Sequence, residues 1–343
     1  MSKPKHILVI RLSAMGDVAM TVPVLRTFAQ TYPTIALTVL TRPFYQPFFE
    51  DIPNLNVLEA DVYGKHKGLG LFHLAREAKS KGIDAVADLH NVIRSKMITK
   101  YLWAMGVRTV TIHKGRAEKK KLIKAAGPEL TPLKSTHQRY ADVFAKLGYP
   151  LDLKTHTFPK RKPLSSRLLD IMGEHAQKAI GIAPFAAYKS KMYPFELMKE
   201  VVKQLDASAN YRIFLFGGGK EEIEDLNTLA LLFPNVTNVA GKLTIEEELA
   251  LISNLDLMLS MDSSNGHLAA MYGIPVITLW GVTHPYAGFV PFQQPETNQL
   301  TADRSQYPLI PTSVYGNKYP SEYENAMETI APESIVTKIK ALL

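Results

Sequence analysis

Two series of short apolar runs, each run followed by a helical pattern, constrain the fold of this chain more than any other feature of its sequence. In the first half, the apolar runs HILVI, IALTVL, NVLEA, AVADLH and VRTVTI alternate with helical patterns at 17–31, 43–49, 71–81, 94–104, 116–125 and 137–147. The second half repeats the rhythm with AIGIAPF, YRIFLF, VTNVAG, LDLMLSMD and IPVITLW, and with helical patterns near 194–207, 220–232, 245–254 and 265–272. Because strands that alternate with helices favour parallel sheets covered by helices, both halves are predicted to be α/β.

A segment rich in proline, lysine and serine separates the two series. It reads HTFPKRKPLSS, a composition typical of a linker. A chain of 343 residues is also long for a single core. The sequence therefore predicts one domain over 1–155, a second over 170–325, and a C-terminal helix over 331–343 that packs back across either domain.

Composition excludes several classes of protein. No apolar run approaches the roughly 18 to 20 residues of a membrane helix. The N-terminus, MSKPKHILVIR, lacks the apolar region of a signal peptide, so a cytoplasmic location is expected. The chain has no cysteine, which excludes disulfides, thiolate metal sites and cysteine nucleophiles.

Positive charge is concentrated in the first half. Residues 1–160 hold 25 lysines and arginines against 12 aspartates and glutamates, although the whole chain has a net charge of only +8. The densest run is HKGRAEKKKLIK, which contains Lys119, Lys120 and Lys121. One interpretation is a solvated helix face. The other is a surface for a polyanion, which could be nucleic acid, anionic lipid or a phosphorylated glycan.

The segment LDLMLSMDSSNGHLAAMYGIPVITLWG carries the strongest signal in the second half. A buried strand ends at Asp262, a polar turn follows, and a helix begins near Asn265 with His267 in its first turn. Hydroxyls and unpaired backbone N–H groups at a helix N-terminus favour a diphosphate. The alternative is simple helix capping, because Asp and Ser are preferred caps without any ligand.

Two further loops of the second half suit a nucleotide. APFAAYKSKMYPFE places Lys189 and Lys191 between a strand and a helix, where a lysine can stabilise the charge of a departing phosphate. The alternative is an ordinary exposed lysine. FLFGGGKEEIE joins three glycines to Glu221 and Glu222, whose carboxylates can accept hydrogen bonds from ribose hydroxyls, but it is not a P-loop.

The first loop of the chain, RLSAMGD, is unsuited to a dinucleotide. It has one glycine instead of the G-x-G-x-x-G fingerprint, and Asp17 would repel a pyrophosphate. Asp17 is either a general base or a cap of the following helix. The chain also lacks D-x-D, H-E-x-x-H and G-x-S-x-G patterns, so catalysis without a metal is the simplest prediction.

Three motifs together resemble the family 9 glycosyltransferases, the lipopolysaccharide heptosyltransferases. ILVIRLSAMGDVAMTVPVLR resembles the opening of that family, with its R-x-S-S-x-G-D loop and T-x-P-x-L-R helix. KMYP resembles its K-x-W-P, and MDSSNGHLAAMYGIPVITLWGVTHP resembles its D-[ST]-G-x-x-H motif and the strand and turn that follow. This chain departs from the family at Ser264, where a glycine is usual, and at Tyr193, where a tryptophan is usual.

The resemblance implies a GT-B fold, with two Rossmann-like domains that face each other across a cleft. The N-terminal domain would bind a lipopolysaccharide core acceptor, and the C-terminal domain a nucleotide sugar, which the family suggests is ADP-heptose. Inverting transfer would need no metal and no cofactor. The partners expected are this donor, this acceptor and the inner membrane surface, where the cytoplasmic protein would be peripheral, and no nucleic acid.

The resemblance also implies roles for individual residues. The catalytic residues would be Asp17, as the general base, and Lys191, which contacts the donor. The nucleotide-sugar site would comprise Asp262, Ser263, Ser264, Gly266, His267, Glu221 as a ribose ligand and Leu243 near the adenine. For the acceptor the resemblance supplies no motif. The basic charge of the first half instead predicts that Lys119, Lys120 and Lys121 steer an anionic acceptor at the membrane, and Ser13 is a further expected acceptor contact.

Two other functions remain open at this point. A nucleotide-sugar epimerase of the same architecture would act without an acceptor. A non-catalytic basic protein that holds an anion would bind without turnover, although the presence of both Asp17 and Lys191 argues against it.

Overall fold

The computed structural model describes residues 3–124, 130–173 and 177–343, and the chain divides into two compact units. Unit 1 comprises Met1–Lys114 and Thr136–Pro159, and unit 2 comprises Gly115–Ser135 and Lys160–Leu343. The chain crosses between the units for the third time after Pro159, inside the predicted linker. The helices of the described residues include none that is long and apolar enough to cross a membrane.

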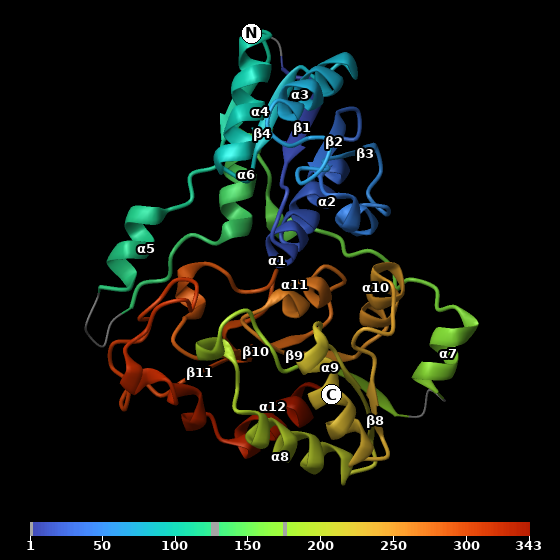
Figure 1. Cartoon of the computed structure of the whole chain (residues 1–343), viewed down its shortest axis with the longest axis vertical. Helices are drawn as coiled ribbons and strands as arrows, with labels where there is room; N and C mark the ends of the chain where they lie inside the picture. The colour runs from blue at the N-terminus through green and yellow to red at the C-terminus, as the bar shows by residue number, and fades with distance from the viewer. Residues whose placement is uncertain (1–2, 125–129, 174–176) are drawn as a thin grey trace. The chain divides into compact units, whose positions relative to one another are not determined.

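Unit 1 is built on a five-stranded parallel sheet (Figure 1). In the order β3-β2-β1-β4-β5, its strands are Leu55–Glu59, Ala36–Thr41, His6–Ile10, Ala85–Asp88 and Arg108–Thr111. Its helices are α1 (Met15–Ala19), α2 (Thr21–Thr31), α3 (Gly70–Ser80), α4 (Ile93–Ala104) and α6 (Thr136–Lys146), with the 3-10 helices η1 (Pro43–Phe48) and η2 (Leu153–Thr155). The helical pattern predicted over 17–31 is therefore two helices that meet at Met20.

Hydrophobic burial explains why these segments form a layered unit. Central strand β1 is buried from Ile7 to Ile10, as expected for a parallel strand covered on both faces. Leu8 and Ile10 pack in one cluster with the buried faces of α3 and α4, which lie against each other (Figure 1). The polar residues that follow each strand are thereby held at one edge of the sheet.

Unit 2 contains a six-stranded parallel sheet. In the order β11-β10-β9-β6-β7-β8, its strands are Gln299–Thr301, Val276–Trp280, Leu257–Met261, Lys178–Ala183, Tyr211–Leu215 and Val236–Asn238. Its helices are α5 (Arg116–Leu122), α7 (Ser166–Met172), α8 (Phe195–Asp206), α9 (Lys220–Leu231), α10 (Ile245–Ser253), α11 (Ser264–Ala270) and α12 (Pro332–Leu342). Five of the six strands match predicted apolar runs. The sixth, β11, has only three residues and no such run.

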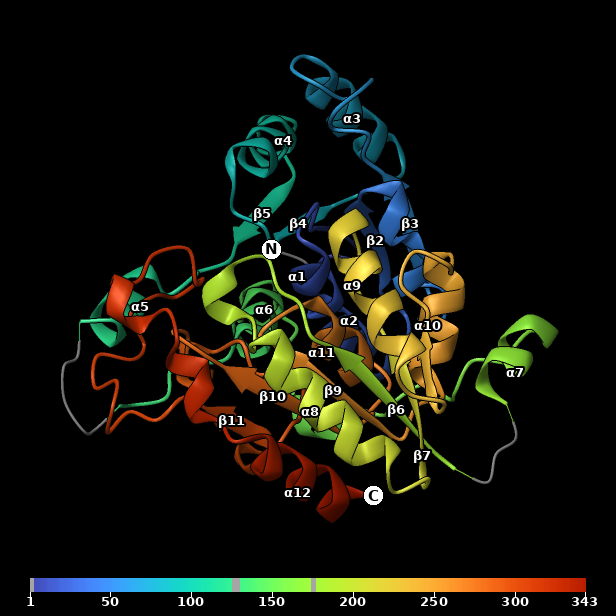
Figure 2. The same cartoon turned by 60° about the horizontal axis from the view of Figure 1, so that its bottom comes forward.

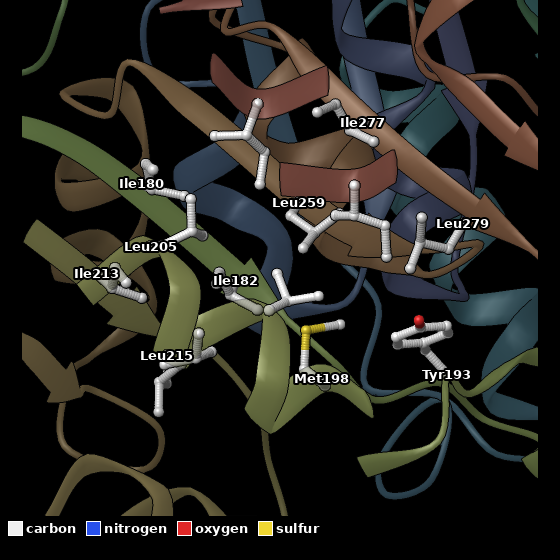
Figure 3. Close-up of a cluster of buried hydrophobic side chains, with 14 of the residues drawn as sticks. Ile180, Ile182, Tyr193, Met198, Leu205, Ile213, Leu215, Leu259, Ile277 and Leu279 are labelled. Atoms are coloured by element: carbon white, nitrogen blue, oxygen red, sulfur yellow. The ribbon is translucent and has the colours of Figure 1, made fainter. Parts of the chain in front are cut away.

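The core of unit 2 is filled by aliphatic side chains from the sheet and from the helices on one face. Figure 3 shows Ile180 and Ile182 of β6 with Leu259 of β9 and Met198 of α8. Helix α12 lies beside α8 (Figures 1 and 2) and buries its apolar face in the same cluster. The predicted C-terminal helix therefore belongs to the core of unit 2.

The segment Gly115–Ser135 belongs to unit 2, although the sequence placed it inside a first domain of 1–155. Its contacts explain the difference. The amide of Leu133 donates a hydrogen bond of 2.9 Å to the carbonyl of Tyr286, in the loop after β10. Tertiary contact, which composition does not report, decides the unit to which this segment belongs.

Candidate functional site

The carboxyl ends of the strands in unit 2 carry most of the residues expected to bind a nucleotide. Lys191 follows β6, Glu221 follows β7, Leu243 follows β8, and Asp262 follows β9. Strands β6 and β9 are neighbours in the sheet, because the chain moves outward from β6 to β8 and then returns to the other side of β6. Open α/β sheets bind ligands outside the carboxyl ends of their strands at such a switch point.

Lys191 and Asp262 meet at this switch point. The Lys191 ammonium lies 2.9 Å from Oδ2 of Asp262, and the two side chains are only 13% and 10% exposed. The Thr283 hydroxyl, after β10, donates to the same Oδ2 at 3.0 Å. An ammonium has three N–H donors, and this ion pair uses one of them. Lys191 is therefore held in place while it can still donate to a phosphate.

The turn after Asp262 supplies further hydrogen-bond donors. Ser263 is the N-cap of α11, but its side chain makes no capping bond, and its buried Oγ has no hydrogen-bond partner among the described residues. Ser264, Gly266 and His267 follow in the first turn of α11. A Cβ at Gly266 would lie 2.6 Å from Oγ of Ser260, so this position requires glycine for the helix to pack on β9.

Both departures from the family pattern fit the local structure. Ser264 is the first residue of α11, and it has no left-handed backbone conformation that would call for glycine. Tyr193 is 2% exposed, and its hydroxyl donates to the Ile330 carbonyl at 2.5 Å. Tyrosine therefore fills the position of the usual tryptophan and ties the loop after β6 to the segment before α12.

The two residues expected to contact the nucleoside lie at the same edge of the sheet, but their contacts give no sign of nucleoside binding. Glu221 is exposed in the first turn of α9, and the neighbouring Glu222 carboxylate accepts the Gly218 amide at 2.8 Å. Leu243 is half-buried just before α10. Their contacts with ribose and adenine stay predictions.

In unit 1, Asp17 does not cap a helix. It lies in the first turn of α1, whose N-cap is Ala14 and has no side-chain capping bond. Its carboxylate instead forms an ion pair with Arg11, with 2.5 Å between Oδ2 and a guanidinium nitrogen. The Asp17 side chain is 35% exposed, so an incoming hydroxyl can reach it. The structure thus contradicts the capping alternative and leaves the role of general base as a prediction, together with an acceptor contact at half-buried Ser13.

Arg11 is itself firmly anchored. It is 5% exposed, and its guanidinium donates to the Leu89 carbonyl at 2.8 Å and lies over the Tyr140 ring, 6.0 Å from the centroid. The Tyr140 hydroxyl donates to the backbone carbonyl of Asp17 at 3.3 Å. Two buried side chains therefore fix both the backbone and the carboxylate of Asp17.

The sequence analysis missed a second polar group beside this loop. Nδ1 of His90, just after β4, accepts the Leu12 amide at 3.4 Å. Asp88, fully buried at the end of β4, accepts the amides of His90 and Asn91, each at 2.9 Å. The only signal in the sequence was that the apolar run AVADLH ends in polar residues. This group braces the loop that carries Asp17 from the neighbouring strand.

Buried histidines make the stability of the protein pH-dependent. Burial, followed by the charges of Arg11 and Lys114, lowers the pKa of His90 to about 3. Burial also lowers the pKa values of His156 and His284 to about 4. Because the unfolded chain protonates these imidazoles near pH 6.5 and the folded chain does not, their contribution is complete above pH 6.5 and is lost as the pH falls towards 4.

We expect the free energy of unfolding to fall by about 1.4 kcal/mol per pH unit for each of these histidines below pH 6.5. Urea unfolding at pH 6.5 and pH 5.0 measures this loss. His90→Asn should reduce the difference between the two pH values by about 2 kcal/mol, since asparagine can still accept the Leu12 amide but does not titrate. The exposed control His73→Gln should leave the difference unchanged, and an equal effect of both variants would contradict the assignment.

The lysine run is not a uniform charged face. Lys119 is only 6% exposed, and its ammonium lies 3.8 Å from the centroid of the Phe289 ring. Lys120 and Lys121 are exposed on the other side of α5. Lys119 therefore packs α5 onto the rest of unit 2, and it does not belong to an exposed charged face. Its contact with the acceptor stays a prediction. Lys120 and Lys121 retain that prediction.

The described residues contain no group of three or more histidine, aspartate or glutamate side chains placed to hold a metal ion. The chemistry of the two sites rests on oppositely charged pairs: Arg11 with Asp17 in unit 1, and Lys191 with Asp262 in unit 2. The first pair offers an oriented carboxylate that can accept a proton. The second offers an oriented cation that can bind a phosphate.

Comparison with known proteins gives a consistent result. The family model described as glycosyltransferase family 9 (heptosyltransferase) matches residues 71–319. The lipopolysaccharide core heptosyltransferase OpsX of Haemophilus influenzae is 26% identical over 294 residues, which cover 82% of this chain and 80% of OpsX.

Two solved structures from Escherichia coli support the fold. ADP-heptose lipopolysaccharide heptosyltransferase II is 19% identical and matches with a TM-score of 0.70 over 98% of both chains. Heptosyltransferase WaaC with ADP-2-deoxy-2-fluoro heptose is 19% identical, with a TM-score of 0.65 over 98% of this chain and all of the other. With the two parallel sheets, these likenesses confirm the predicted GT-B fold class.

Proposed function

Since this chain belongs to glycosyltransferase family 9, the heptosyltransferases, we propose that it transfers a heptose from ADP-heptose to a lipopolysaccharide core acceptor. The observation that carries the proposal is the buried ion pair between Lys191 and Asp262 at the switch point of unit 2. A held lysine beside the serine hydroxyl of Ser263 suits the diphosphate of a nucleotide sugar. The similarity to WaaC with an ADP-heptose analogue supports ADP-heptose as the donor.

The proposed reaction is one direct displacement. Asp17 accepts the proton of an acceptor hydroxyl as the hydroxyl oxygen forms a bond to the anomeric carbon. The bond between that carbon and the diphosphate oxygen breaks, and its electron pair leaves with ADP. Lys191 donates to the diphosphate and stabilises the negative charge that grows there. The configuration at the anomeric carbon is inverted, because there is a single displacement.

Arg11 orients the base in this proposal. Its ion pair uses Oδ2 of Asp17, and Oδ1 is not part of that pair. The anchor of Arg11 on the Leu89 carbonyl keeps the carboxylate from rotating freely. Holding a reacting group in one orientation contributes to rate because the entropy of alignment is lost before the reaction.

The acceptor proposed is a lipopolysaccharide core at the cytoplasmic face of the inner membrane. The similarity to the core heptosyltransferase OpsX supports this class of acceptor. Exposed Lys120 and Lys121 would contribute attraction to anionic lipid or to the acceptor itself. A peripheral contact with the membrane would bring the enzyme to a substrate that is anchored there.

Incubation of the purified protein with ADP-heptose and a heptose-deficient core acceptor tests the proposal. Mass spectrometry should show an acceptor that is heavier by one heptose, and the release of ADP should require the acceptor. ADP-glucose and UDP-glucose are the donor controls. Release of nucleotide without acceptor, or isomerisation of the donor sugar, would favour an epimerase instead. If the protein neither transfers a sugar nor binds ADP, the non-catalytic alternative remains.

The same assay tests whether a metal is needed. We expect the rate to be unchanged by EDTA, because the proposed leaving-group stabilisation comes from Lys191. Loss of activity in EDTA that Mg²⁺ restores would contradict metal-free transfer.

A further inference from the structure

Three side chains at the carboxyl end of the unit 1 sheet form a group that no motif indicated. Arg42 follows β2, Tyr63 follows β3, and Arg94 lies in the first turn of α4 after β4. Both guanidinium groups lie over the same ring: that of Arg42 is 5.4 Å from the Tyr63 centroid, and that of Arg94 is 4.8 Å away. Tyr63 is nevertheless 65% exposed. Residues from three successive strand ends thus converge on one aromatic side chain.

The group carries positive charge without a matching acid. Within the described parts of the chain, neither Arg42 nor Arg94 forms an ion pair with a carboxylate. Two like charges held beside one ring repel each other, and the ring compensates only in part, by about 0.5–1 kcal/mol for each exposed cation. An anion bound between the two guanidinium groups would relieve that repulsion.

Packing connects this group to the helix that carries Asp17 within the same unit. Arg42 is the N-cap of η1, and η1 packs against α1, which contains Asp17. The charge of Arg94 also helps to lower the pKa of His90, the side chain that braces the loop that carries Asp17. A ligand on the arginines would therefore extend towards the proposed base.

The chemistry of the group selects a class of ligand. An exposed tyrosine ring offers an apolar face against which the C–H face of a sugar ring can pack, and its hydroxyl can hydrogen-bond to sugar hydroxyls. Arginine forks match the geometry of carboxylate and phosphate oxygens. We propose that Arg42, Tyr63 and Arg94 form a binding site for a sugar that bears a carboxylate or a phosphate. The inference rests on the proposed function only in taking this sugar to be part of the acceptor.

Binding of small probes tests the site without any turnover. Ligand-observed NMR titrations to about 50 mM would compare galacturonic acid, glucose 6-phosphate and neutral glucose. We expect at least one anionic sugar to bind about tenfold or more tightly than glucose, since a hydrogen bond to a charged group contributes roughly 1.5–3 kcal/mol. The better anionic probe identifies the group recognised, carboxylate or phosphate.

Matched variants assign that binding to the residues. Arg42→Gln and Arg94→Gln should each weaken binding of the anionic sugar about tenfold, and Tyr63→Ala should weaken it as well. Arg76→Gln is the control, because Arg76 also lies over a ring in unit 1, but that ring is Phe72, 5.8 Å away at its centroid, and not Tyr63. Urea unfolding would verify that each variant is folded.

Several outcomes would overturn the inference. These are equal binding of all three probes, no saturable binding of an anionic sugar by the unsubstituted protein, or equal effects of Arg42→Gln and Arg76→Gln. If Arg42→Gln and Arg94→Gln weaken binding to phosphatidylglycerol vesicles but leave sugar binding unchanged, the two arginines form a lipid-binding surface instead. ADP binding by unit 2 should be normal in every variant. If anionic sugars bind here but ADP-heptose is never used, the site stands and the proposed function fails.

Discussion

Replacing Asp17 by asparagine is expected to lower the rate of sugar transfer by about 10²-fold or more, the scale of a general base. Asparagine keeps the size of the side chain, and its oxygen can still accept a hydrogen bond from Arg11, so the loop should keep its conformation. What asparagine loses is the ability to accept a proton. Single-turnover kinetics of Asp17→Asn with saturating donor and acceptor measure this step directly.

ADP affinity separates loss of the base from general damage. Titration calorimetry should give the same ADP affinity for Asp17→Asn and for the unsubstituted protein, because Asp17 lies in unit 1. Asp170→Asn, which changes an exposed aspartate of α7, is the matched control and should transfer at the normal rate. A rate for Asp17→Asn within tenfold of normal would remove Asp17 from the role of base.

Replacing Lys191 by methionine is expected to have two separable effects. It removes the cation that we propose stabilises the leaving diphosphate, so turnover should fall by about 10²-fold or more and ADP should bind more weakly. It also leaves the buried Asp262 carboxylate without its cation, which costs roughly 3–5 kcal/mol in comparable buried pairs. The free energy of unfolding should therefore fall along with activity.

A double variant distinguishes catalysis from stability. In Lys191→Met combined with Asp262→Asn, the buried charge is gone from both partners, so most of the lost stability should return. Turnover should not return, because no cation is present to meet the diphosphate. Recovery of both properties in the double variant would show that Lys191 serves only to neutralise Asp262.

The neighbouring lysine provides the control. Lys189 lies in the same short 3-10 turn, but it is 77% exposed and pairs with Glu324 at 2.5 Å on the surface. Exposed ion pairs contribute little to stability, about 0–1 kcal/mol. Lys189→Ala should therefore change neither ADP affinity nor turnover appreciably.

The local pattern of the sequence predicted most of the fold. An apolar run followed by a helical pattern specifies a strand covered by a helix, independently of the segments that pack against it. This explains why predicted apolar runs match strands β1 to β10. The pattern cannot be recognised in β11, because three residues are too few to show a hydrophobic periodicity. Its place at the edge of the sheet depends on pairing with β10, which the sequence of β11 does not encode on its own.

The residues of the proposed nucleotide site carry clearer signals in the sequence than those of unit 1. Lys191 and Asp262 lie in conspicuous polar turns at the ends of strands, and motifs of fixed spacing draw attention to them. Arg42, Tyr63 and Arg94 stand alone in three different loops, with no shared motif. Only the order β3-β2-β1-β4 brings those loops to one edge of the sheet.

The sequence by itself determined the α/β class, the linker and the polar character of the strand ends, because these depend on residues that are neighbours in the chain. Tertiary structure decided which of those ends meet. It paired Lys191 with Asp262 by setting β6 beside β9, and it buried Lys119 of the basic run against Phe289. Charge along a chain is a local property, whereas burial and ion pairing depend on elements that are distant in sequence and that only the packed sheet and its helices bring into contact.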